Sequence, residues 1–460
     1  MLRILGQKPR IVKELELNMK TELLLPAGSL EKMRAAFSFG ADAIYAGQPR
    51  YSLRARNNEF GLEELAQGIL EARALGKKFY VASNLMPHNA KVKTYLSDME
   101  RVVEMKPDAL IMADPGLIMM VREKWPDLPV HLSVQANTVN YASVQFWKSL
   151  GLARVILSRE LSLEEIAEIR DRCPDMELEV FVHGALCIAY SGRCLLSGYF
   201  NHRDPNQGTC TNSCRWDYKV SSAVEDEGAG IAKIDFDFER ESARSASLGG
   251  QQRHPLADRI YLIEESKRPG ELMPIFEDEH GTYIMNSKDL RAVEHVGRLV
   301  EMGIDSLKVE GRTKSLYYVA RTAQVYRRAI DDAAAGRPFD PALLPELEGL
   351  ANRGYTDGFY VRHHTENYQN YMRGHSESSR SLYVGDVLSI ENGLAEVEVK
   401  NRFEVGDRLE IIHPSGNRVI LLEKMLDHEG AGISVAKGAG HRVKIPLDEG
   451  LESALLARFL

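Results

Sequence analysis

Long apolar stretches are missing from this chain of 460 residues, and none approaches the roughly 18 residues that a membrane-spanning helix needs. The N-terminal segment carries scattered charges and no continuous apolar core, which disfavours a secretory signal and predicts a cytoplasmic protein that does not enter a membrane. Cysteine is scarce, with five residues, and in a reducing compartment disulfides are a poor explanation for them. The net charge of −8 argues against a positively charged coat for non-specific nucleic-acid binding.

Well-known catalytic signatures are absent as well. The chain contains no G-x-S-x-G, no H-E-x-x-H and no Walker loop, so a hydrolase would need an arrangement that these motifs do not describe. No G-x-G-x-x-G follows the first predicted strand, which disfavours an open, doubly wound sheet. The composition, 44% hydrophobic and 27% charged, is typical of a globular protein. The length suits one large barrel with a smaller domain.

A phrase that recurs along the chain predicts the architecture. An amphipathic helix ends, usually at glycine, and a short apolar strand begins two or three residues later, as at residues 39–47, 150–158 and 302–311. Strands in which apolar and polar residues do not alternate are buried on both faces, as in a parallel sheet covered by helices. Eight strands are predicted, at residues 22–26, 43–46, 78–83, 109–113, 130–134, 155–158, 177–182 and 306–310. Eight strand–helix units indicate an α/β fold, a (β/α)8 barrel of the TIM type.

Other segments precede, interrupt and follow this barrel. We expect residues 1–20 to be an N-terminal extension and residues 21–375 to form the barrel domain. After the seventh strand come a cysteine-rich loop and a polar stretch, residues 221–259, which we interpret as a loop or a partly disordered insertion. In residues 376–460 the hydrophobic period changes to two, which predicts a small all-β domain that forms a barrel.

Four cysteines follow directly on the seventh predicted strand. Cys187, Cys194, Cys210 and Cys214 have the spacing C-x6-C-x15-C-x3-C. Thiolates gathered in one loop suit zinc or an iron–sulfur cluster, and the wide, asymmetric spacing favours a [4Fe–4S] cluster over the paired knuckles of structural zinc. Zinc and unmetallated core thiols remain the alternatives. Cys173, at a helix end before a proline, is interpreted as a free structural thiol.

The carboxyl ends of barrel strands are where catalytic groups are expected. By strand alternation, Glu179 and His183 should lie on one face, and His183 stands four residues before Cys187. The alternative for Glu179 is a buried ion pair with an arginine of the barrel. The polar residues at the strand ends are Tyr45, Asn84, Asp114, Gln135, Asn137, Arg159, Glu160, His183, Glu310 and Arg312.

Basic residues interleave with aromatic residues in two places. One is the stretch of residues 312–328, and the other is a loop with Arg50, Tyr51, Arg54 and Arg56. Such mixtures suit phosphate contact and base stacking. A solvated helix face explains the first group nearly as well, and arginines in a mouth loop are also natural receptors for carboxylates.

Residues 179–187, Glu-Val-Phe-Val-His-Gly-Ala-Leu-Cys, followed by Ser-Gly-Arg-Cys-Leu-Leu-Ser at 191–197, resemble the signature of the peptidase U-32, or collagenase-like, family. The phrases at residues 45–54, 131–137, 204–210 and 277–286 are similar to a branch of that family that hydroxylates tRNA. The resemblance extends from about residue 21 to the C-terminus. For this branch the protease label would be a misnomer.

The resemblance implies prephenate-dependent 5-hydroxylation of the wobble uridine, position 34, in the anticodon loop of tRNA. It also implies an iron–sulfur cluster on the cysteines of the motif. We expect His183, Glu179 and Glu310 to act in catalysis and Arg50, Arg54 and Arg159 to bind prephenate. Further substrate-binding candidates are Arg312, Tyr45, Gln135 and Asn137. The rival hypotheses are a peptidase and a non-catalytic RNA-binding scaffold stabilised by zinc.

Overall fold

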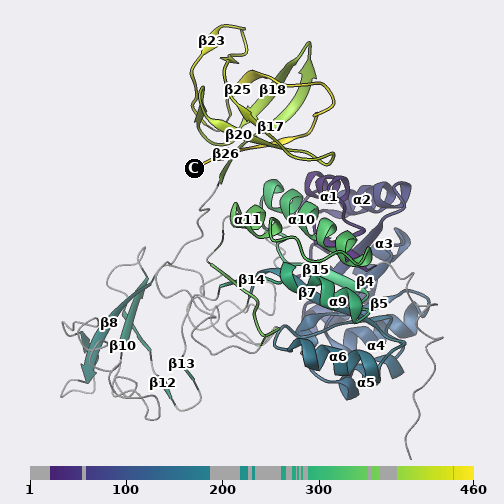
Figure 1. Ribbon diagram of the computed structural model, residues 1–460. Coiled ribbons are helices and arrows are strands. Elements are labelled where there is room, and N and C mark those ends of the chain that lie inside the picture. The colour runs from purple at the N-terminus through teal and green to yellow at the C-terminus, as the bar shows by residue number, and fades with distance from the viewer. Residues whose placement is uncertain are drawn as a thin grey trace, which may run out of the picture.

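The computed structural model describes residues 21–53, 59–186, 288–350, 352, 354–361, 381–438 and 440–460, together with the backbone of six short strands between residues 218 and 282. A parallel barrel and an antiparallel β domain make up most of it, and the β domain packs against helix α10 (Leu316–Ala334) of the barrel (Figure 1). No helix within these ranges is long and apolar enough to cross a membrane.

All eight predicted barrel strands are present and form one closed parallel sheet. They follow one another in chain order, and the eighth strand, β15, pairs with both β7 and β1, which closes the ring. The strands are β1 (Glu22–Pro26), β2 (Ala43–Gly47), β3 (Lys78–Ser83), β4 (Ala109–Met112), β5 (Val130–Leu132), β6 (Arg154–Ile156), β7 (Glu177–Ala185) and β15 (Ser306–Val309). The prediction of a TIM-type barrel is confirmed.

Helices alternate with these strands and cover the outside of the barrel (Figure 1). Local sequence fixes where they begin. In α6, for example, the Ser162 hydroxyl accepts a hydrogen bond from the Glu165 amide while the Glu165 carboxylate accepts one from the Ser162 amide. The helices before α10 are α1 (Leu30–Ser38), α2 (Leu62–Ala74), α3 (Asn89–Glu104), α4 (Pro115–Lys124), α5 (Tyr141–Ser149), α6 (Leu163–Arg172) and α9 (Val296–Glu301). After α10 comes α11 (Leu343–Glu348).

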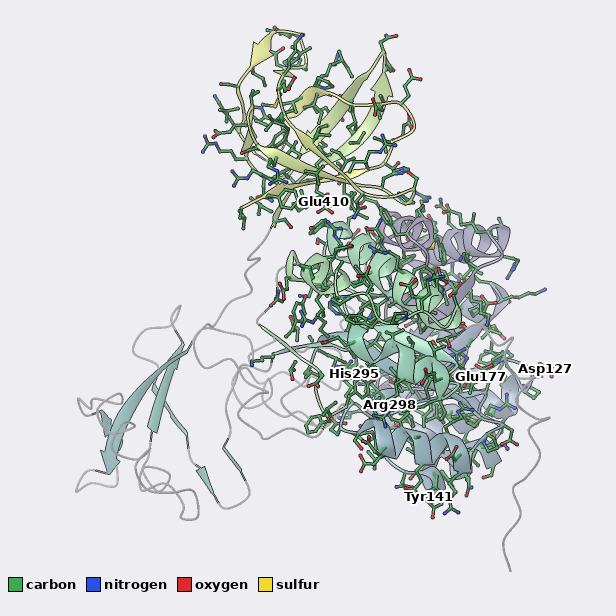
Figure 2. The ribbon with its side chains drawn as sticks, viewed as in Figure 1. Asp127, Tyr141, Glu177, His295, Arg298 and Glu410 are labelled. Carbon is green, nitrogen blue, oxygen red and sulfur yellow. The ribbon has the colours of Figure 1, made fainter. Side chains whose placement is uncertain are left out.

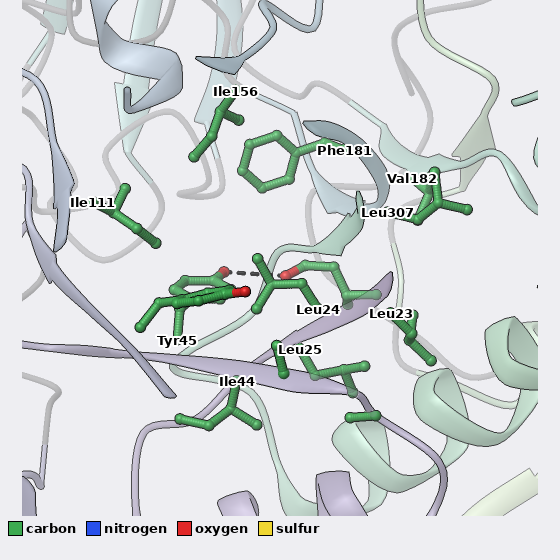
Figure 3. Packing of buried hydrophobic residues seen from close by; sticks show 14 of the residues in the cluster. Leu23, Leu24, Leu25, Ile44, Tyr45, Ile111, Ile156, Phe181, Val182 and Leu307 are labelled. Atoms are coloured by element: carbon green, nitrogen blue, oxygen red, sulfur yellow. Dashed lines mark hydrogen bonds between the residues drawn. The ribbon is translucent and has the colours of Figure 1, made fainter. Parts of the chain in front are cut away.

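The strands and the inner faces of the helices share one continuous apolar core. Residues 23–25 of β1 are fully buried because alternate side chains meet the lumen on one side and the helices on the other. Ile111, Ile156, Phe181 and Tyr45 come from four different strands and lie near one another (Figure 3). This burial on both faces explains why the strands appear in the sequence as apolar runs without alternation.

The sheet continues beyond the barrel at the end of β7. Strand β14 (Asp289–Arg291) pairs antiparallel with the last residues of β7, and β16 (Tyr355–Thr356) pairs in parallel with β14. Neither strand was predicted, because two or three residues carry no detectable period. Their pairing places segments from two distant parts of the chain beside the end of β7.

The polar stretch after the cysteines contains strands. β8 pairs antiparallel with β9 and with β10, and β10 pairs with β11, while β12 and β13 form a separate pair. We expected a loop or a partly disordered insertion at residues 221–259, and this is wrong for the residues that form β8 and β9. Polar composition did not exclude them, because a strand with one apolar face needs only alternate apolar residues. The strands are β8 (Tyr218–Glu225), β9 (Ile231–Lys233), β10 (Tyr261–Glu265), β11 (Leu272–Ile275), β12 (Glu277–Asp278) and β13 (Gly281–Thr282).

The C-terminal domain is all-β, as predicted. Its main antiparallel sheet has the order β21-β20-β26-β17-β18-β25-β22-β23, and β19 pairs with β24. Alternate residues of β18 are buried, as the period of two predicts. The strands are β17 (Ser381–Glu391), β18 (Leu394–Val399), β19 (Phe403–Glu404), β20 (Arg408–Ile412), β21 (Arg418–Leu421), β22 (Met425–Leu426), β23 (Gly432–Ile433), β24 (Val435–Ala436), β25 (Arg442–Pro446) and β26 (Leu455–Phe459).

Candidate active site

The carboxyl ends of the barrel strands surround a cavity of about 120 Å³. Active sites of TIM-type barrels occupy this end of the strands. The sequence-predicted residues that line the cavity are Tyr45, Asn84, Gln135, Arg159, Glu310 and Arg312. Lining residues that sequence reasoning missed include Ser133, Phe181 and Lys308.

Arg159 follows β6 and is almost fully buried at the cavity wall. Its guanidinium stacks over the Phe181 ring at 3.8 Å from the centroid, donates to the Ala185 carbonyl at 2.7 Å and pairs with Glu310 Oε2 at 3.0 Å. A stacked, forked cation of this kind can exchange one carboxylate partner for another. Arg159 therefore suits the recognition of a carboxylate ligand.

Arg312 follows β15 and holds the loop after β2. Its Nη1 donates to Ser52 Oγ at 2.5 Å and its Nη2 donates to the Leu53 carbonyl at 2.6 Å. The same guanidinium lies 5.9 Å from the Tyr45 ring centroid, while the Tyr45 hydroxyl donates to the Val309 carbonyl at 3.1 Å. Arg312 thus adds positive charge to the cavity and fixes the shape of its rim.

A buried charge network lies next to the cavity, inside the barrel. Glu179 is fully buried, and its two oxygens accept from Lys308 Nζ at 2.7 Å and Arg154 Nη1 at 3.0 Å. Arg154 also donates to Glu22 at 2.7 Å. Burial alone would raise the pKa of Glu22, but the Arg154 guanidinium more than offsets this and lowers it. The ion-pair interpretation of Glu179 is confirmed, and its partners are Arg154 and Lys308.

Burial lowers the pKa of Lys308, while the Glu179 carboxylate opposes that shift. Lys308 was missed although a signal existed. The residue stands two positions before Glu310 and four before Arg312, and strand alternation places residues 308 and 310 on the same face. The candidates that the sequence predicts stand at strand ends, whereas Lys308 belongs to the strand itself.

His183 does not share the face of Glu179, so that expectation is wrong. The pairing of β7 with β15 matches Lys308 to Phe181 and Val309 to His183, and this bulge reverses the side-chain alternation after Phe181. His183 lies instead among tyrosines of the outer layer, with its Nδ1 3.3 Å from the Tyr326 hydroxyl. Burial lowers the pKa of His183 to about 3, so the imidazole is neutral at neutral pH.

Gly184 follows the bulge and permits this close packing. Its φ of +104° is one that favours glycine, and a Cβ there would lie 2.5 Å from the Glu310 carbonyl oxygen. The glycine of the motif therefore lets the end of β7 pass beside the residues that follow β15. A side chain at residue 184 would push Glu310 away from the cavity.

The remaining strand-end residues serve the loops around the cavity. Gln135 is buried and accepts from the Ser133 hydroxyl at 3.2 Å. Asn137 adopts a left-handed conformation and donates to the Gln135 carbonyl at 3.0 Å, so it shapes this turn without lining the cavity. Asp114 caps α4 by accepting from the Leu117 amide at 2.9 Å. Glu160 accepts from the Ser158 hydroxyl.

The arginines of the loop after β2 are divided. Arg50 does not line the cavity, since its guanidinium pairs with Asp98 of α3 at 2.6 Å and half of its side chain is exposed. Tyr51 is fully buried and donates to the same carboxylate at 2.5 Å. Arg54 and Arg56 lie outside the described residues. Of the three arginines predicted to bind prephenate, Arg159 alone is placed at the cavity.

Most of the basic and aromatic side chains of α10 are buried or paired within the protein, which disfavours both a nucleic-acid surface and a solvated helix face here. Arg321 is 1% exposed and forms a bidentate pair with Glu410 of the β domain, at 3.1 and 2.5 Å. Glu410 lies on the side of the β domain that faces the barrel (Figure 2). Arg327 pairs with Asp42 at 2.8 Å, and the Tyr317 ring stacks on Tyr383. This helix is the support on which the β domain rests.

A larger cavity, of about 670 Å³, lies between α10, α11 and the β20–β21 hairpin. The arginines that line it, Arg327 and Arg328, are each paired with carboxylates, namely Asp42 and Asp331 for the first and Asp340 and Glu346 for the second. We therefore place the candidate active site at the smaller cavity, where strand ends converge and cations outnumber carboxylates.

The four clustered cysteines, Cys187, Cys194, Cys210 and Cys214, lie outside the described residues. The chain reaches them from the cavity rim, because Ala185, two residues before Cys187, accepts a hydrogen bond from Arg159. Elsewhere in the described part of the chain, no group of three or more His, Cys, Asp or Glu side chains could hold a metal ion. Cys173 is buried with its thiol intact at the end of α6, and its role as a structural thiol fits that position.

Comparison with known proteins identifies two matching regions. Residues 28–370 match the model of peptidase family U32, and residues 379–458 match that of the peptidase family U32 C-terminal domain. The tRNA hydroxylation protein P of Escherichia coli is 61% identical over 442 residues, covering 95% of this chain and 97% of that protein. The protein of the same name from Haemophilus influenzae is 58% identical over 446 residues, covering 96% of each chain.

A collagenase from Porphyromonas gingivalis is also similar, with 26% identity over 445 residues that cover 93% of this chain and 95% of that protein. Relatives with different printed names thus share the whole two-domain arrangement. The family matches together extend over almost all of the described barrel and β domain. The chain belongs to peptidase family U32.

Proposed function

We propose that this protein hydroxylates tRNA in the cytoplasm, at carbon 5 of the wobble uridine, with prephenate as co-substrate and with a [4Fe–4S] cluster. The observation that carries the proposal is the similarity, above half identity over nearly the full length, to two proteins named for tRNA hydroxylation. The cation-rich cavity at the barrel mouth supports it, since prephenate is a small dicarboxylate.

Arg159 is the first candidate to hold a carboxylate of prephenate. Its guanidinium is stacked on Phe181 and already paired with the Glu310 carboxylate, so an incoming carboxylate would replace or join a partner of the same chemistry. Glu310, displaced in this way, becomes available to accept a proton from the substrate. Arg312 keeps the rim in place through Ser52 and Leu53 during the exchange.

The uridine must leave its stack in the anticodon loop to reach the cavity, and a single-stranded loop allows this at low cost. Because the chain is acidic overall, tRNA binding must rely on a local surface around the mouth. We therefore expect a modest dependence of tRNA affinity on salt, equivalent to a few phosphate contacts. The α10 arginines are less suited to that surface, since Arg321 is paired with Glu410 of the β domain and Arg327 with Asp42 of the barrel.

Cys187, Cys194, Cys210 and Cys214 would hold the cluster. Four thiolates are the usual donor set of a [4Fe–4S] cluster, and the segment that carries them begins two residues after the cavity-rim carbonyl of Ala185. When bound, such a cluster supplies one-electron transfer. Anaerobic reconstitution provides the test: wild type should take up four iron and four sulfide, and C187A and C194A should lose most of both. Full iron and sulfide in these variants would contradict the assignment.

The function itself is tested by nucleoside analysis of tRNA from a bacterial strain that lacks its own uridine hydroxylases. Expression of wild type should restore 5-hydroxyuridine-derived nucleosides. R159A should restore at most a small fraction, whereas R50A, whose arginine faces α3, should restore the wild-type amount. If wild type restores none, the proposed reaction is wrong.

Peptidase activity is the competing function that family relatives suggest. Peptide hydrolysis would require a nucleophile with an adjacent base, or an activated water. The described residues that line the cavity include neither histidine nor cysteine, and the Ser133 hydroxyl is bonded to Gln135. Incubation of the purified protein with denatured collagen should leave the substrate intact, and cleavage that R159A abolishes would favour the peptidase instead.

A further inference from the structure

We propose that Lys308 is a further ligand-binding residue and that its ammonium receives one carboxylate of a small dicarboxylate bound in the mouth cavity. This inference rests on the proposed function, because the dicarboxylate would be its co-substrate. It adds a binding residue that neither the strand-end pattern nor the family signature indicates.

The hydrogen bonding of Lys308 carries the inference. The side chain lines the cavity, is 3% exposed, and donates to Glu179 Oε1 at 2.7 Å. An ammonium has three donors, and the described residues supply an acceptor to one of them. Its ammonium also lies near the Tyr45 and Phe181 rings, with centroids at 4.4 and 5.4 Å, and is close enough to Glu310 and Arg154 for their charges to act on it. The further donors of the ammonium can therefore serve an acceptor located in the cavity.

The charge of the cavity indicates that this acceptor is an anion. Lys308, Arg159 and Arg312 bring three cations to the lining, and Glu310 brings one carboxylate. Behind Lys308, Glu179 also binds Arg154, which is paired in turn with Glu22 and Glu177. A carboxylate ligand would bring a second negative charge to a lining that contains three cations. Burial lowers the pKa of Lys308, and a bound carboxylate would favour its charged form again.

The volume and the lining of the cavity favour the binding of one carboxylate end of a larger ligand. The cavity of about 120 Å³ has room for a carboxylate and the few atoms next to it. The donors are side-chain forks and an ammonium, which suit planar carboxylates. A second carboxylate of the same molecule would remain near Arg159 and Arg312, where the cavity opens towards the strand ends.

Lys308 is held in position before any ligand arrives. Glu179 fixes its ammonium, Arg154 fixes Glu179, and Glu22 fixes Arg154. A cation held in this way loses little conformational entropy on binding, which favours affinity. The network next to the cavity would thus act as the support of the binding site.

Calorimetric titration of the full-length protein with prephenate, malonate and inorganic phosphate tests the inference. K308M should lower prephenate and malonate affinity at least tenfold while preserving the circular dichroism spectrum. The matched control is K78M, since Lys78 contacts the same network through Glu22 at 3.4 Å but is 55% exposed and does not line the cavity. K78M should change affinity less than twofold. Unchanged affinity in folded K308M, or phosphate binding as tight as malonate binding, would overturn the proposal.

A crystal structure of wild type soaked in malonate provides a measurement that needs no variant. A carboxylate oxygen should lie within hydrogen-bond distance of Lys308 Nζ, and malonate bound elsewhere would refute the assignment. Failure of the reaction is distinguishable from failure of the site. If K308M loses dicarboxylate binding but wild type restores no hydroxylated uridine, the site stands and the reaction falls. If wild type restores the nucleoside while K308M binds normally, the reaction stands and the Lys308 assignment falls.

Discussion

The barrel mouth and the surface of α10 contain the same residue types in different roles. At the mouth, Arg159 and Arg312 line a cavity together with Tyr45. On α10, Arg321 is buried against Glu410, and Tyr317 stacks on Tyr383 of the β domain. Interleaved arginine and tyrosine therefore do not by themselves indicate a ligand site. What distinguishes the two regions is where the cations lie: three cations and one carboxylate line the mouth cavity, whereas Arg321 of α10 is buried against Glu410.

This comparison also separates stability from function. Charges that are completely paired within the protein should matter for folding and leave ligand binding unchanged. Charges at the cavity should matter for ligand binding and little for folding. Lys308 is the exception, because the buried network of Glu179, Arg154 and Glu22 also holds it. The following variants test this division.

The largest effect is expected from Glu179, which holds two buried cations. E179Q would remove the carboxylate that binds Lys308 and one of the three that bind Arg154, and it should lower the free energy of unfolding by about 4 kcal/mol. Urea unfolding measures the loss. E177Q is the control, because Glu177 binds the same Arg154 but is 47% exposed, and it should cost less than about 1 kcal/mol. Equal losses would show that burial is not what makes the network important.

The next effect concerns the support of the β domain. R321M removes a buried cation from Glu410 and should destabilise the protein by about 3 kcal/mol in urea unfolding. R328M, which changes an arginine with a side chain 45% exposed on the same helix, should cost at most about 1 kcal/mol. Both variants should bind prephenate like wild type. Weakened binding in R321M would break the distinction between the two regions.

A pH effect is expected from His183, whose pKa burial lowers to about 3. The unfolded chain takes up a proton near pH 6.5 while the folded protein does not, so stability is lost as pH falls below that value. From pH 7 to pH 5 this residue should account for a loss of about 2 kcal/mol. H183F should flatten that slope in urea unfolding at the two pH values. An unchanged slope would mean that the imidazole is not buried as described.

The smallest effect is expected at the cavity wall. R159K keeps the charge but loses the forked, stacked geometry, and it should weaken prephenate binding about tenfold, or about 1.4 kcal/mol. R50K should bind within twofold of wild type, because Arg50 pairs with Asp98 away from the cavity. Calorimetry measures both. Equal weakening in the two variants would return Arg50 to the binding site.

The architecture could be predicted from the sequence because the positions of helices and strands depend on local patterns. The helix–glycine–strand phrase, with the apolar runs that lie between its instances, located all eight barrel strands, and the period of two located the β domain. Six strand-end residues predicted as candidates do line the mouth cavity, since a barrel brings all its strand ends together whatever the details of packing. Short strands such as β14 were missed, because pairing with a neighbour rather than local pattern forms them.

The side-chain direction of His183 and the placement of Lys308 depended on more than the local sequence. Alternation predicts that His183 shares the face of Glu179, but a bulge opposite Lys308 and Val309 turns it to the outer layer. Likewise, Arg50 could face the cavity or α3, and the position of Asp98 determines which. The four cysteines, which carry the cofactor hypothesis, lie outside the described residues, so their role remains a prediction from spacing and resemblance.

The sequence by itself determined the barrel, the β domain and the set of polar residues at the strand ends. The reason is that the spacing of hydrophobic residues, the helix ends and the turns are local properties of the chain. The tertiary structure decided which of these residues meet. Lys308 and Glu179 are 129 positions apart, and Arg321 and Glu410 are 89 apart, yet each pair is in contact. Whether a charged side chain faces a cavity or a buried partner depends on the register of strand pairing and on which distant carboxylate lies within reach. Both are fixed only when the chain folds.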